Sequence, residues 1–380
     1  MIEDVTCIKF PATWGIKREP ARPPHLRIDY CGGMRFDDNF DWHNLWYDAV
    51  QINEQQTLLI GPPLYGAKDW FQANAGFADR DGNMLDYQFY DLDRVSYTVV
   101  MTKSTDSHIV MLSKDTEPVP IELRHNDGYF NGHKVMVTLQ RDNPIEWIEQ
   151  WMDYHYRVHG IDGFLIYDNA SNDYTIGELD HRLSRPYLKL KVIPWPYPYG
   201  PQGSDHAPWD SDYGQYCMLE HAKYRHLSHA SMVLNNDVDE LIVTQGPSIE
   251  QIRTQLDAGP HHCLYYVGRW IEPYDLPRGQ SAHELPLSSR RFWDYCCTDA
   301  NNKRGIGNKW MLVPKHCMGY QWRVHHIAGP AGQSTDLYYA HYLSMNTNWS
   351  WSRDHFKGDV NDLKPEPWLH TALQKIEVHR

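Results

Sequence analysis

Between residues 133 and 195 the sequence alternates between buried strands and amphipathic helices, and this alternation constrains the fold more than any other feature. "HKVMVTLQ" is apolar and β-branched, and "IEWIEQWMDYHYRVHG" carries apolar residues at three- and four-residue steps. "DGFLIYD", "IGELDHRLS" and "YLKLKVIPW" continue the order as strand, helix and strand. Such repeats form parallel sheets with right-handed crossovers. We therefore predict an α/β fold with a mostly parallel sheet flanked by helices.

The first 130 residues follow a different pattern. Short apolar runs, such as "TLLIGPP" and "VSYTVVMT", alternate with clusters of Gly, Pro, Asp and Asn, which is typical of a β-rich module. A chain of 380 residues has room for roughly two to three domains. We predict a β-rich accessory domain over residues 1–130, an α/β domain over 131–345 and a C-terminal extension over 346–380.

The stretch "SMVLNNDVDELIV" ends an apolar run on two aspartates, Asp237 and Asp239. Asp-x-Asp triplets also occur at 79–81, 91–93 and 210–212, so the triplet alone is weak evidence. The pair at 237 and 239 differs because it follows a predicted strand of the α/β sheet. In an extended segment two such side chains point to the same side, roughly 7 Å apart, and can approach one cation. Oxygen ligands of this kind favour Mg²⁺ or Mn²⁺.

Further polar residues follow the other predicted strands. Ligands of open α/β sheets gather at the carboxyl ends of the strands, which places Gln140, Arg141, Asp168 and Asn169 on the same edge as the aspartate pair. Asp168 and Asn169 can offer hydrogen bonds to a base or a ribose, although the same Asn- and Ser-rich segment is also typical of a simple turn. A cation at this edge can screen the diphosphate of a nucleotide-activated donor.

Composition narrows the function classes. Acidic residues outnumber basic ones by 49 to 36, giving a net charge of -13, so we expect no nucleic-acid partner. The seven cysteines form no CxxC pair, which indicates reduced thiols and not a disulfide framework or a zinc site. No apolar run is long enough for a membrane span, and the start lacks the order of a secretion signal. We predict a cytoplasmic protein, for which a peripheral membrane contact is compatible with the sequence.

Several segments, taken in order, resemble one enzyme family. They are "IEWIEQWMDYHYRVHGIDGFLIYDNASND", the helix around residues 215–217, "NNDVDELIV", Lys309 with Pro314, "VHH" at 324–326 and "AHY" at 340–342. Together they are similar to the family 92 glycosyltransferases and the related family 2-like enzymes, over about residues 133–345. The middle segments carry most of this similarity.

The resemblance implies a GT-A type fold and a metal-dependent reaction. A sugar, with a UDP-sugar as the expected donor, would pass to a glycan, a glycolipid or another hydroxyl acceptor, as in the building of surface polysaccharides. Carried over by position, Asp237 and Asp239 would serve the metal and the diphosphate, and Asp168 would serve the nucleoside. Relatives commonly end the first strand with Lys-Asn-Glu, whereas this chain has Gln140 and Arg141 followed by Asp142. The chain therefore departs from the family pattern at the end of the first strand, where relatives contact the nucleotide.

The resemblance also implies a histidine late in the fold that completes the metal or diphosphate site. His325 is the first choice and His341 the second, with a structural hydrogen bond as the alternative role for each. Lys309 would neutralise phosphate charge, with an ordinary surface lysine as the alternative.

An inverting enzyme of this kind needs a carboxylate that takes the proton of the acceptor hydroxyl. We expect this base between about residues 264 and 300, where Glu272 and Asp294 are the candidates and each can equally be a surface acid. Trp270 and Trp293 are candidate platforms for the acceptor, with core packing as the alternative.

Two other function classes stay open from the sequence. A metal-dependent phosphohydrolase or pyrophosphorylase would also use paired aspartates, but it calls for a second metal site or a glycine-rich phosphate loop, and neither is evident. A non-catalytic carbohydrate-binding protein is compatible with 15 Trp and 25 Tyr residues. It would need neither a nucleotide nor a metal.

Overall fold

The computed structural model describes residues 1–27, 35–103, 106–114, 116–201, 211–345, 347 and 353–377, and these form two compact units. Unit 1 comprises Met1–Glu3, Phe130–Ile193 and His229–Arg380, and unit 2 comprises Asp4–Tyr129 and Pro194–Ser228. Residues 194–228 therefore group with the β-rich part of the chain. The predicted division at residues 130 and 345 stays a prediction, because compactness alone does not define an independent domain. None of the helices in the described part of the chain is long and apolar enough to cross a bilayer.

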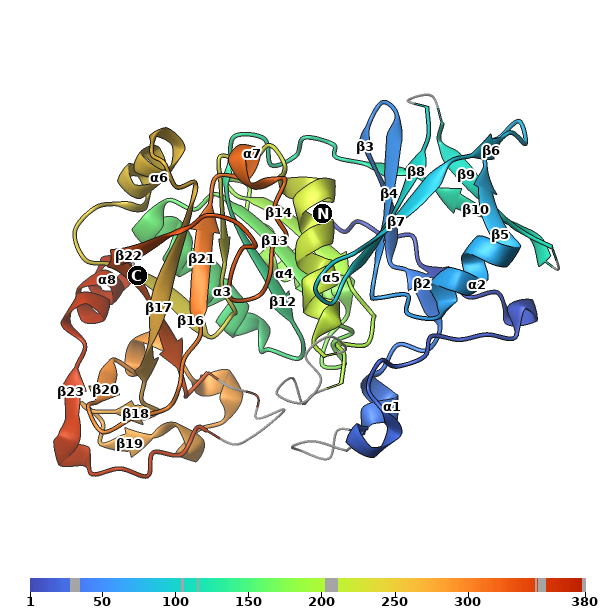
Figure 1. Ribbon diagram of the computed structural model, residues 1–380. Coiled ribbons are helices and arrows are strands. Elements are labelled where there is room, and N and C mark those ends of the chain that lie inside the picture. The colour runs from blue at the N-terminus through green and yellow to red at the C-terminus, as the bar shows by residue number, and fades with distance from the viewer. Residues whose placement is uncertain are drawn as a thin grey trace. The chain divides into compact units, whose positions relative to one another are not determined.

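An eight-stranded mixed sheet forms the centre of unit 1 (Figure 1). Its order is β14-β13-β12-β15-β21-β17-β22-β16. The strands are β12 (Lys134–Gln140), β13 (Gly163–Asp168), β14 (Lys189–Pro194), β15 (Met232–Asn235), β16 (Glu240–Thr244), β17 (Cys263–Ile271), β21 (Asn308–Leu312) and β22 (Gly332–Tyr342).

The prediction of a mostly parallel sheet agrees with only one half of the observed sheet. β12 pairs in parallel with β13 and with β15, as the alternation of strands and helices requires. β21 pairs antiparallel with β15 and β17, and β16 pairs antiparallel with β22, whereas β17 and β22 run parallel. In this second half β15 and β16 are joined by a short turn, β16 and β17 by the helix α6 (Ile249–Ala258), and β21 and β22 by a segment that contains α7 (Pro314–Cys317).

The helices of unit 1 are α3 (Ile145–His159), α4 (Ile176–Leu183), α6 (Ile249–Ala258), α7 (Pro314–Cys317) and α8 (Pro367–Glu377). α3 shows why these residues form a helix and where it stops. Pro144 precedes the first turn, and Gly160 ends the helix in the left-handed region with φ 64°. α4 and α6 begin at Thr175 and Ser248, whose side chains accept hydrogen bonds from backbone amides of the first turn.

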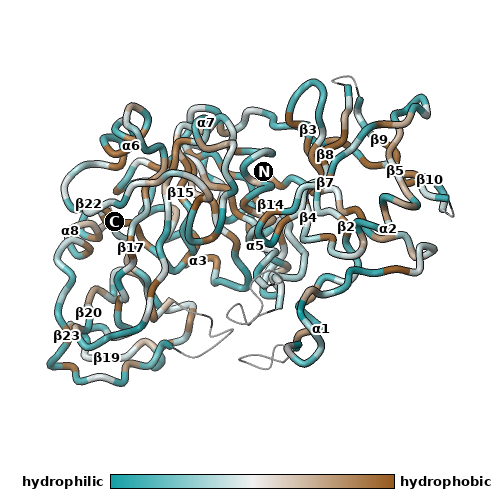
Figure 2. The backbone as a smooth tube through the Cα atoms, in the orientation of Figure 1, coloured by the Kyte–Doolittle hydropathy of each residue, from teal (hydrophilic) through white to brown (hydrophobic). Residues whose placement is uncertain are grey.

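One continuous apolar core holds unit 1 together. It combines the inward face of α3, with Ile148, Trp151 and Met152, and the strand residues Met136, Phe164 and Leu234. Figure 2 shows the hydrophobic segments gathered along the strands and the polar segments along the outer loops. The buried apolar area of this core is the main stabilising contribution to the sheet that carries the candidate site.

Unit 1 also contains four short strands, and the strands of unit 2 form separate sheets of their own. In unit 1 they are β18 (Tyr274–Asp275), β19 (Gln280–Ser281), β20 (Cys297–Asp299) and β23 (Leu363–Pro365). Unit 2 has a five-stranded sheet of order β11-β3-β4-β8-β7, a four-stranded sheet of order β10-β9-β5-β6 and the β1-β2 pair. Their bounds are β1 (Ile8–Lys9), β2 (Asn44–Trp46), β3 (Asp48–Asn53), β4 (Gln56–Gly61), β5 (Ala75–Ala78), β6 (Met84–Leu85), β7 (Tyr87–Asp91), β8 (Ser96–Met101), β9 (His108–Ser113), β10 (Thr116–Glu122) and β11 (Arg124–His125).

The helices of unit 2 are α1 (Phe36–Asn39), α2 (Ala67–Asn74) and α5 (Tyr213–Ala222), and α5 continues into a π-helical turn over Lys223–Leu227. The strand content of residues 1–130 agrees with the β-rich pattern of the sequence. An accessory role for this part of the chain stays a prediction.

Candidate active site

The Asp-x-Asp pair lies in the turn between β15 and β16. The backbone amide of Glu240 donates to the Asp237 carbonyl over 3.1 Å, which closes this turn. The sequence analysis treated the segment as extended, with both carboxylates on one side. In the structure the two carboxylates instead meet different cationic side chains, Lys309 and Arg353.

Four side chains of α3 hold the start of β16 in place. The Trp151 indole donates to the Glu240 carbonyl over 3.1 Å, and the Tyr154 hydroxyl donates to the Ile242 carbonyl over 2.7 Å. His159 Nε2 also lies 2.7 Å from that carbonyl, and the Ile242 amide donates to His155 Nε2 over 3.2 Å. The α3 contacts therefore fix the backbone from which the acidic side chains project.

Glu240 and Lys309 form the buried part of the site. Both side chains are 1% exposed, and Lys309 Nζ lies 3.4 Å from Glu240 Oε2 and 2.9 Å from Asp237 Oδ2. Glu240 Oε2 also accepts from Asn236 Nδ2 and from the Asp237 amide, at 3.1 and 3.0 Å. Burial raises the pKa of Glu240 to about 7, although the Lys309 charge opposes this shift. Burial lowers the pKa of Lys309, but Asp237 and Glu240 outweigh it and raise that pKa above its usual value.

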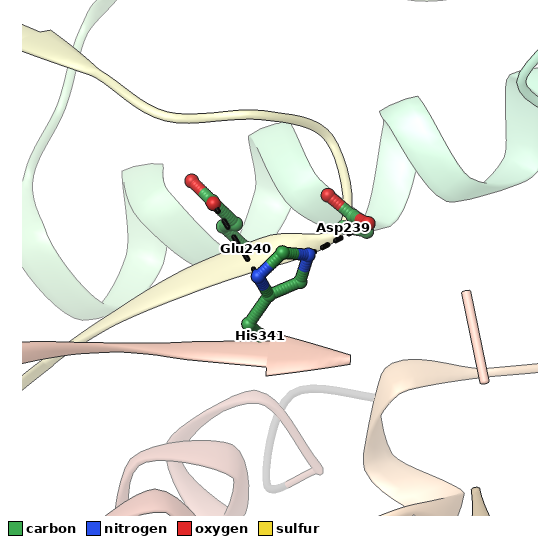
Figure 3. Close-up of side chains that lie close together, drawn as sticks. All are labelled: Asp239, Glu240 and His341. Carbon is green, nitrogen blue, oxygen red and sulfur yellow. Dashed lines mark hydrogen bonds and ion pairs between the residues drawn. The ribbon is translucent and has the colours of Figure 1, made fainter. Parts of the chain in front are cut away.

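Asp239, Glu240 and His341 bring three potential metal ligands together (Figure 3). His341 Nε2 lies 3.1 Å from Asp239 Oδ2, and His341 Nδ1 lies 3.7 Å from Glu240 Oε1. One ligand atom from each residue falls within 4.8 Å of the other two. The imidazole reaches this position because His341 of β22 pairs directly with Glu240 of β16. The Trp270 ring stacks on the imidazole, with centroids 4.3 Å apart.

Arg353 completes the charge balance around Asp239. Its Nη2 lies 3.0 Å from Asp239 Oδ2, and its Nη1 lies 3.4 Å from His341 Nε2. Burial raises the pKa of Asp239, but His341 and Arg353 outweigh it and lower that pKa to about 2. Asp239 is therefore ionised at every pH at which the protein is expected to work.

The ends of β12 and β13 form a second polar group. Gln140 pairs with Asp168 in the sheet register, and its side-chain amide donates to the Asp168 carboxylate. Ser171 Oγ donates to the same carboxylate over 2.6 Å, and the Tyr174 hydroxyl donates to Gln140 Oε1 over 2.9 Å. The prediction that Gln140 and Asp168 lie together agrees with this geometry. Both side chains stabilise the turn after β13, and burial raises the pKa of Asp168.

Arg141 and Asn169 occupy different surroundings at this edge. Arg141 is exposed, and its Nε lies 3.5 Å from Asp142 Oδ2. Asn169 is buried, and its backbone amide donates to the Gln140 carbonyl over 2.8 Å. Arg141 is thus the one of these two whose side chain faces solvent and can reach a ligand.

The two candidate bases differ in their surroundings. Glu272 follows the end of β17, is buried, and accepts a hydrogen bond from Asn302 Nδ2 over 2.5 Å. Burial raises the pKa of Glu272, as it does that of Asp294. Asp294 pairs with Arg278 at 3.0 Å. Along the chain Glu272 lies two residues beyond Trp270, which stacks on His341, whereas Asp294 belongs to a later segment.

His325, the first-choice histidine of the sequence analysis, lies close enough to Lys309 and Asp237 for their charges to act on its imidazole. Its Nδ1 is 3.0 Å from the Asn308 carbonyl, and it does not belong to the group of converging ligand atoms found in the described residues. The geometry favours the second choice, His341. Neither Glu240 nor Arg353 was singled out from the sequence as a site residue. Glu240 stands directly beside Asp239 in the sequence, which is the one signal that could have marked it.

One family model matches this chain. The model of glycosyltransferase family 92 matches residues 140–354, which is more than half of the chain. The chain belongs to glycosyltransferase family 92. Membership identifies it as a glycosyltransferase, and the matched range spans the sheet edge, the acidic turn, His341 and Arg353. The predicted resemblance to this family is confirmed.

Solved structures similar to this family 92 chain are distant. HddC from Yersinia pseudotuberculosis is 12% identical, covers 54% of this chain and 92% of its own, and has a TM-score of 0.29. TarS residues 1–349 from S. aureus, in complex with UDP, is 13% identical over 55% of this chain and 60% of its own, with a TM-score of 0.31. Core-mannan synthase A from Aspergillus fumigatus, in a Mn/GDP form, is 10% identical over 77% and 98%, with a TM-score of 0.30. No similar protein was found among proteins of curated function.

Proposed function

We propose that this family 92 member transfers a sugar from a nucleotide-diphosphate donor to a hydroxyl group in a metal-dependent reaction. The proposal includes a GT-A type fold, a UDP-sugar as the donor, a glycan or glycolipid as the acceptor, and inversion at the anomeric carbon. One observation carries the metal dependence: Asp239, Glu240 and His341 converge at the start of β16 and the end of β22. Strand ends of an open α/β sheet are the usual place for a ligand.

The donor atoms of this group fit a divalent cation. Two carboxylates and one imidazole nitrogen are available, and His341 Nδ1 is buried without a hydrogen-bond partner among the described residues. A buried polar atom of this kind needs a partner, which a cation would supply. Mg²⁺ prefers oxygen ligands throughout, so the imidazole makes Mn²⁺ the better fit. When bound, the cation would screen the negative charge of the donor diphosphate.

The remaining roles follow from position and charge. We assign Lys309 and Arg353 to the cationic side of the site, where each neutralises one aspartate. Glu272 is assigned as the base that accepts the proton of the acceptor hydroxyl while that oxygen attacks the anomeric carbon. Burial raises the pKa of Glu272, which makes it a stronger base than an exposed carboxylate. Trp270, which stacks on His341, is the assigned platform for the acceptor sugar.

The test is release of nucleoside diphosphate from UDP- and GDP-sugars, with Mn²⁺ and with EDTA. We expect turnover that requires the metal and that Asp239→Ala abolishes while the circular dichroism spectrum is retained. Glu250→Gln is a matched control, because Glu250 is an exposed acid that pairs with Arg253. Turnover that persists both in EDTA and in Asp239→Ala would refute the metal assignment.

A further inference from the structure

A hollow on unit 1 is lined by residues outside the group of Asp239, Glu240 and His341, and one of them is Trp293, which the sequence suggested as an acceptor platform. It encloses about 350 Å³. One wall is the face of α3 opposite to the buried one, where Glu149, Gln150, Asp153 and Arg157 recur at helical spacing. Trp293, from the segment after β19, faces this wall. The Phe292 amide donates to Gln150 Oε1 over 3.2 Å, which fixes the segment against α3.

The lining is polar and nearly neutral. Three acids, including Glu149 and Asp153, are balanced by three arginines, including Arg157 and Arg291. Glu149 is already held by Arg182 at 2.9 Å and by Arg185 at 3.3 Å. In contrast, the side chains of Asp153 and Arg157 make no hydrogen bond or ion pair with any residue in the described part of the chain. The pocket therefore offers one acceptor and one donor group that a ligand can use.

These properties fit an uncharged polyhydroxylated ligand. Phosphate would meet three acids, and a divalent cation would meet three guanidinium groups, so the balanced charge disfavours both. A pyranose ring has an apolar C–H face that stacks on an indole, and its neighbouring hydroxyl groups pair with planar carboxylates, amides and guanidinium groups. The volume is in the range of small-molecule sites. Trp293 supplies the indole, and Asp153, Arg157 and Gln150 supply the planar polar groups.

We infer that this pocket is a glycan-binding site that holds one or two sugar units outside the catalytic centre. Binding itself does not depend on the proposed transfer reaction. Only its role rests on the proposed function: a glycan anchored here would keep an acceptor chain close to the enzyme and raise its effective concentration at the catalytic centre.

Binding is tested by saturation-transfer difference NMR with maltose, cellobiose, lactose and N,N′-diacetylchitobiose at millimolar concentration, without nucleotide or metal. We expect at least one disaccharide to give signals. Trp293→Ala should weaken its affinity by about tenfold. Trp368→Ala, which removes an exposed tryptophan of α8, is the matched control and should leave affinity unchanged. Arg157→Ala removes an exposed side chain, so it tests the pocket even where Trp293→Ala fails to fold.

Two results would overturn the inference. One is the absence of signals from all four disaccharides. The other is a signal that survives Trp293→Ala and Arg157→Ala but disappears in Trp270→Ala, because the glycan would then sit in the candidate active site. Asp239→Ala separates this inference from the proposed function, because that variant should lose turnover and still bind the disaccharide normally. If the wild type binds the disaccharide but shows no turnover, only the transfer reaction is refuted.

Discussion

Replacing Glu240 by Gln should stabilise the protein and inactivate it at the same time. Burial raises the pKa of Glu240 from 4.5 to about 7, so the folded state disfavours the charged form that the unfolded chain adopts at neutral pH. Below pH 4.5 Glu240 is protonated in both the folded and the unfolded state, so its burial costs no stability there. As the pH rises through 7 the carboxylate must ionise in the folded state, and this part of the stability is lost. At about 1.4 kcal/mol per pKa unit, the cost of ionised Glu240 at pH 8 is about 3 kcal/mol. The uncharged amide that Glu240→Gln introduces would avoid this cost and keep an oxygen that accepts from Asn236.

The assay is urea denaturation in EDTA at pH 5 and pH 8, compared between the wild type and Glu240→Gln. The variant should gain about 3 kcal/mol in free energy of unfolding at pH 8 and about 1 kcal/mol or less at pH 5. The exposed control Glu250→Gln should change stability by less than about 1 kcal/mol at either pH. A loss of stability at pH 8, or a gain of equal size at both pH values, would refute the argument that burial of this charge is costly. Metal-dependent turnover should be absent in Glu240→Gln, because a ligand carboxylate is removed.

Three further outcomes follow. Glu272→Gln should lower kcat by about a hundredfold or more, as expected for the loss of a general base. Asp294→Asn should retain most activity, because Arg278 already engages that carboxylate. Steady-state kinetics of the two variants decide which carboxylate is the base. His159 stays neutral in the fold, where burial lowers its pKa to about 4, so its contribution to stability is present above pH 6.5 and is lost as the pH falls towards 4. His159→Gln should therefore show a smaller decrease in Tm between pH 7 and pH 5 than the wild type, and an unchanged decrease would contradict this.

The pattern of strands and helices from residue 133 predicted half of the sheet correctly. β12, α3, β13, α4 and β14 appear in that order, since each segment carries its own period and its own buried face. The antiparallel partners β21 and β16 could not be foreseen. Their pairing depends on contacts between residues far apart in the chain, and the short apolar runs that form them are compatible with several registers.

The candidate site was predictable where its residues follow strands. Gln140 and Asp168 stand at the ends of adjacent parallel strands, so their contact follows from the topology. The choice between His325 and His341 did not follow from the sequence. His341 meets Glu240 only because β22 returns antiparallel beside β16, and Arg353 reaches Asp239 across 114 residues. A spacing rule cannot detect a contact of that kind.

The charges of the site explain how three carboxylates can share one small region. Asp237 and Asp239 are each neutralised by one cation of the chain, Lys309 and Arg353, and Glu240 has the pKa near 7 that burial imposes on it. The group can therefore fold without an uncompensated buried charge, because Glu240 takes up a proton whenever nothing else neutralises it. A divalent cation that binds at Asp239, Glu240 and His341 would displace that proton. Because Glu240, with a pKa of about 7, is half protonated at pH 7, metal binding should release about half a proton per site there and nearly one at about pH 6, and it should tighten as the pH rises. Calorimetric titration with Mn²⁺ in buffers of different ionisation enthalpy measures this directly. Binding with no proton release at pH 6.5 would show that Glu240 is not a ligand.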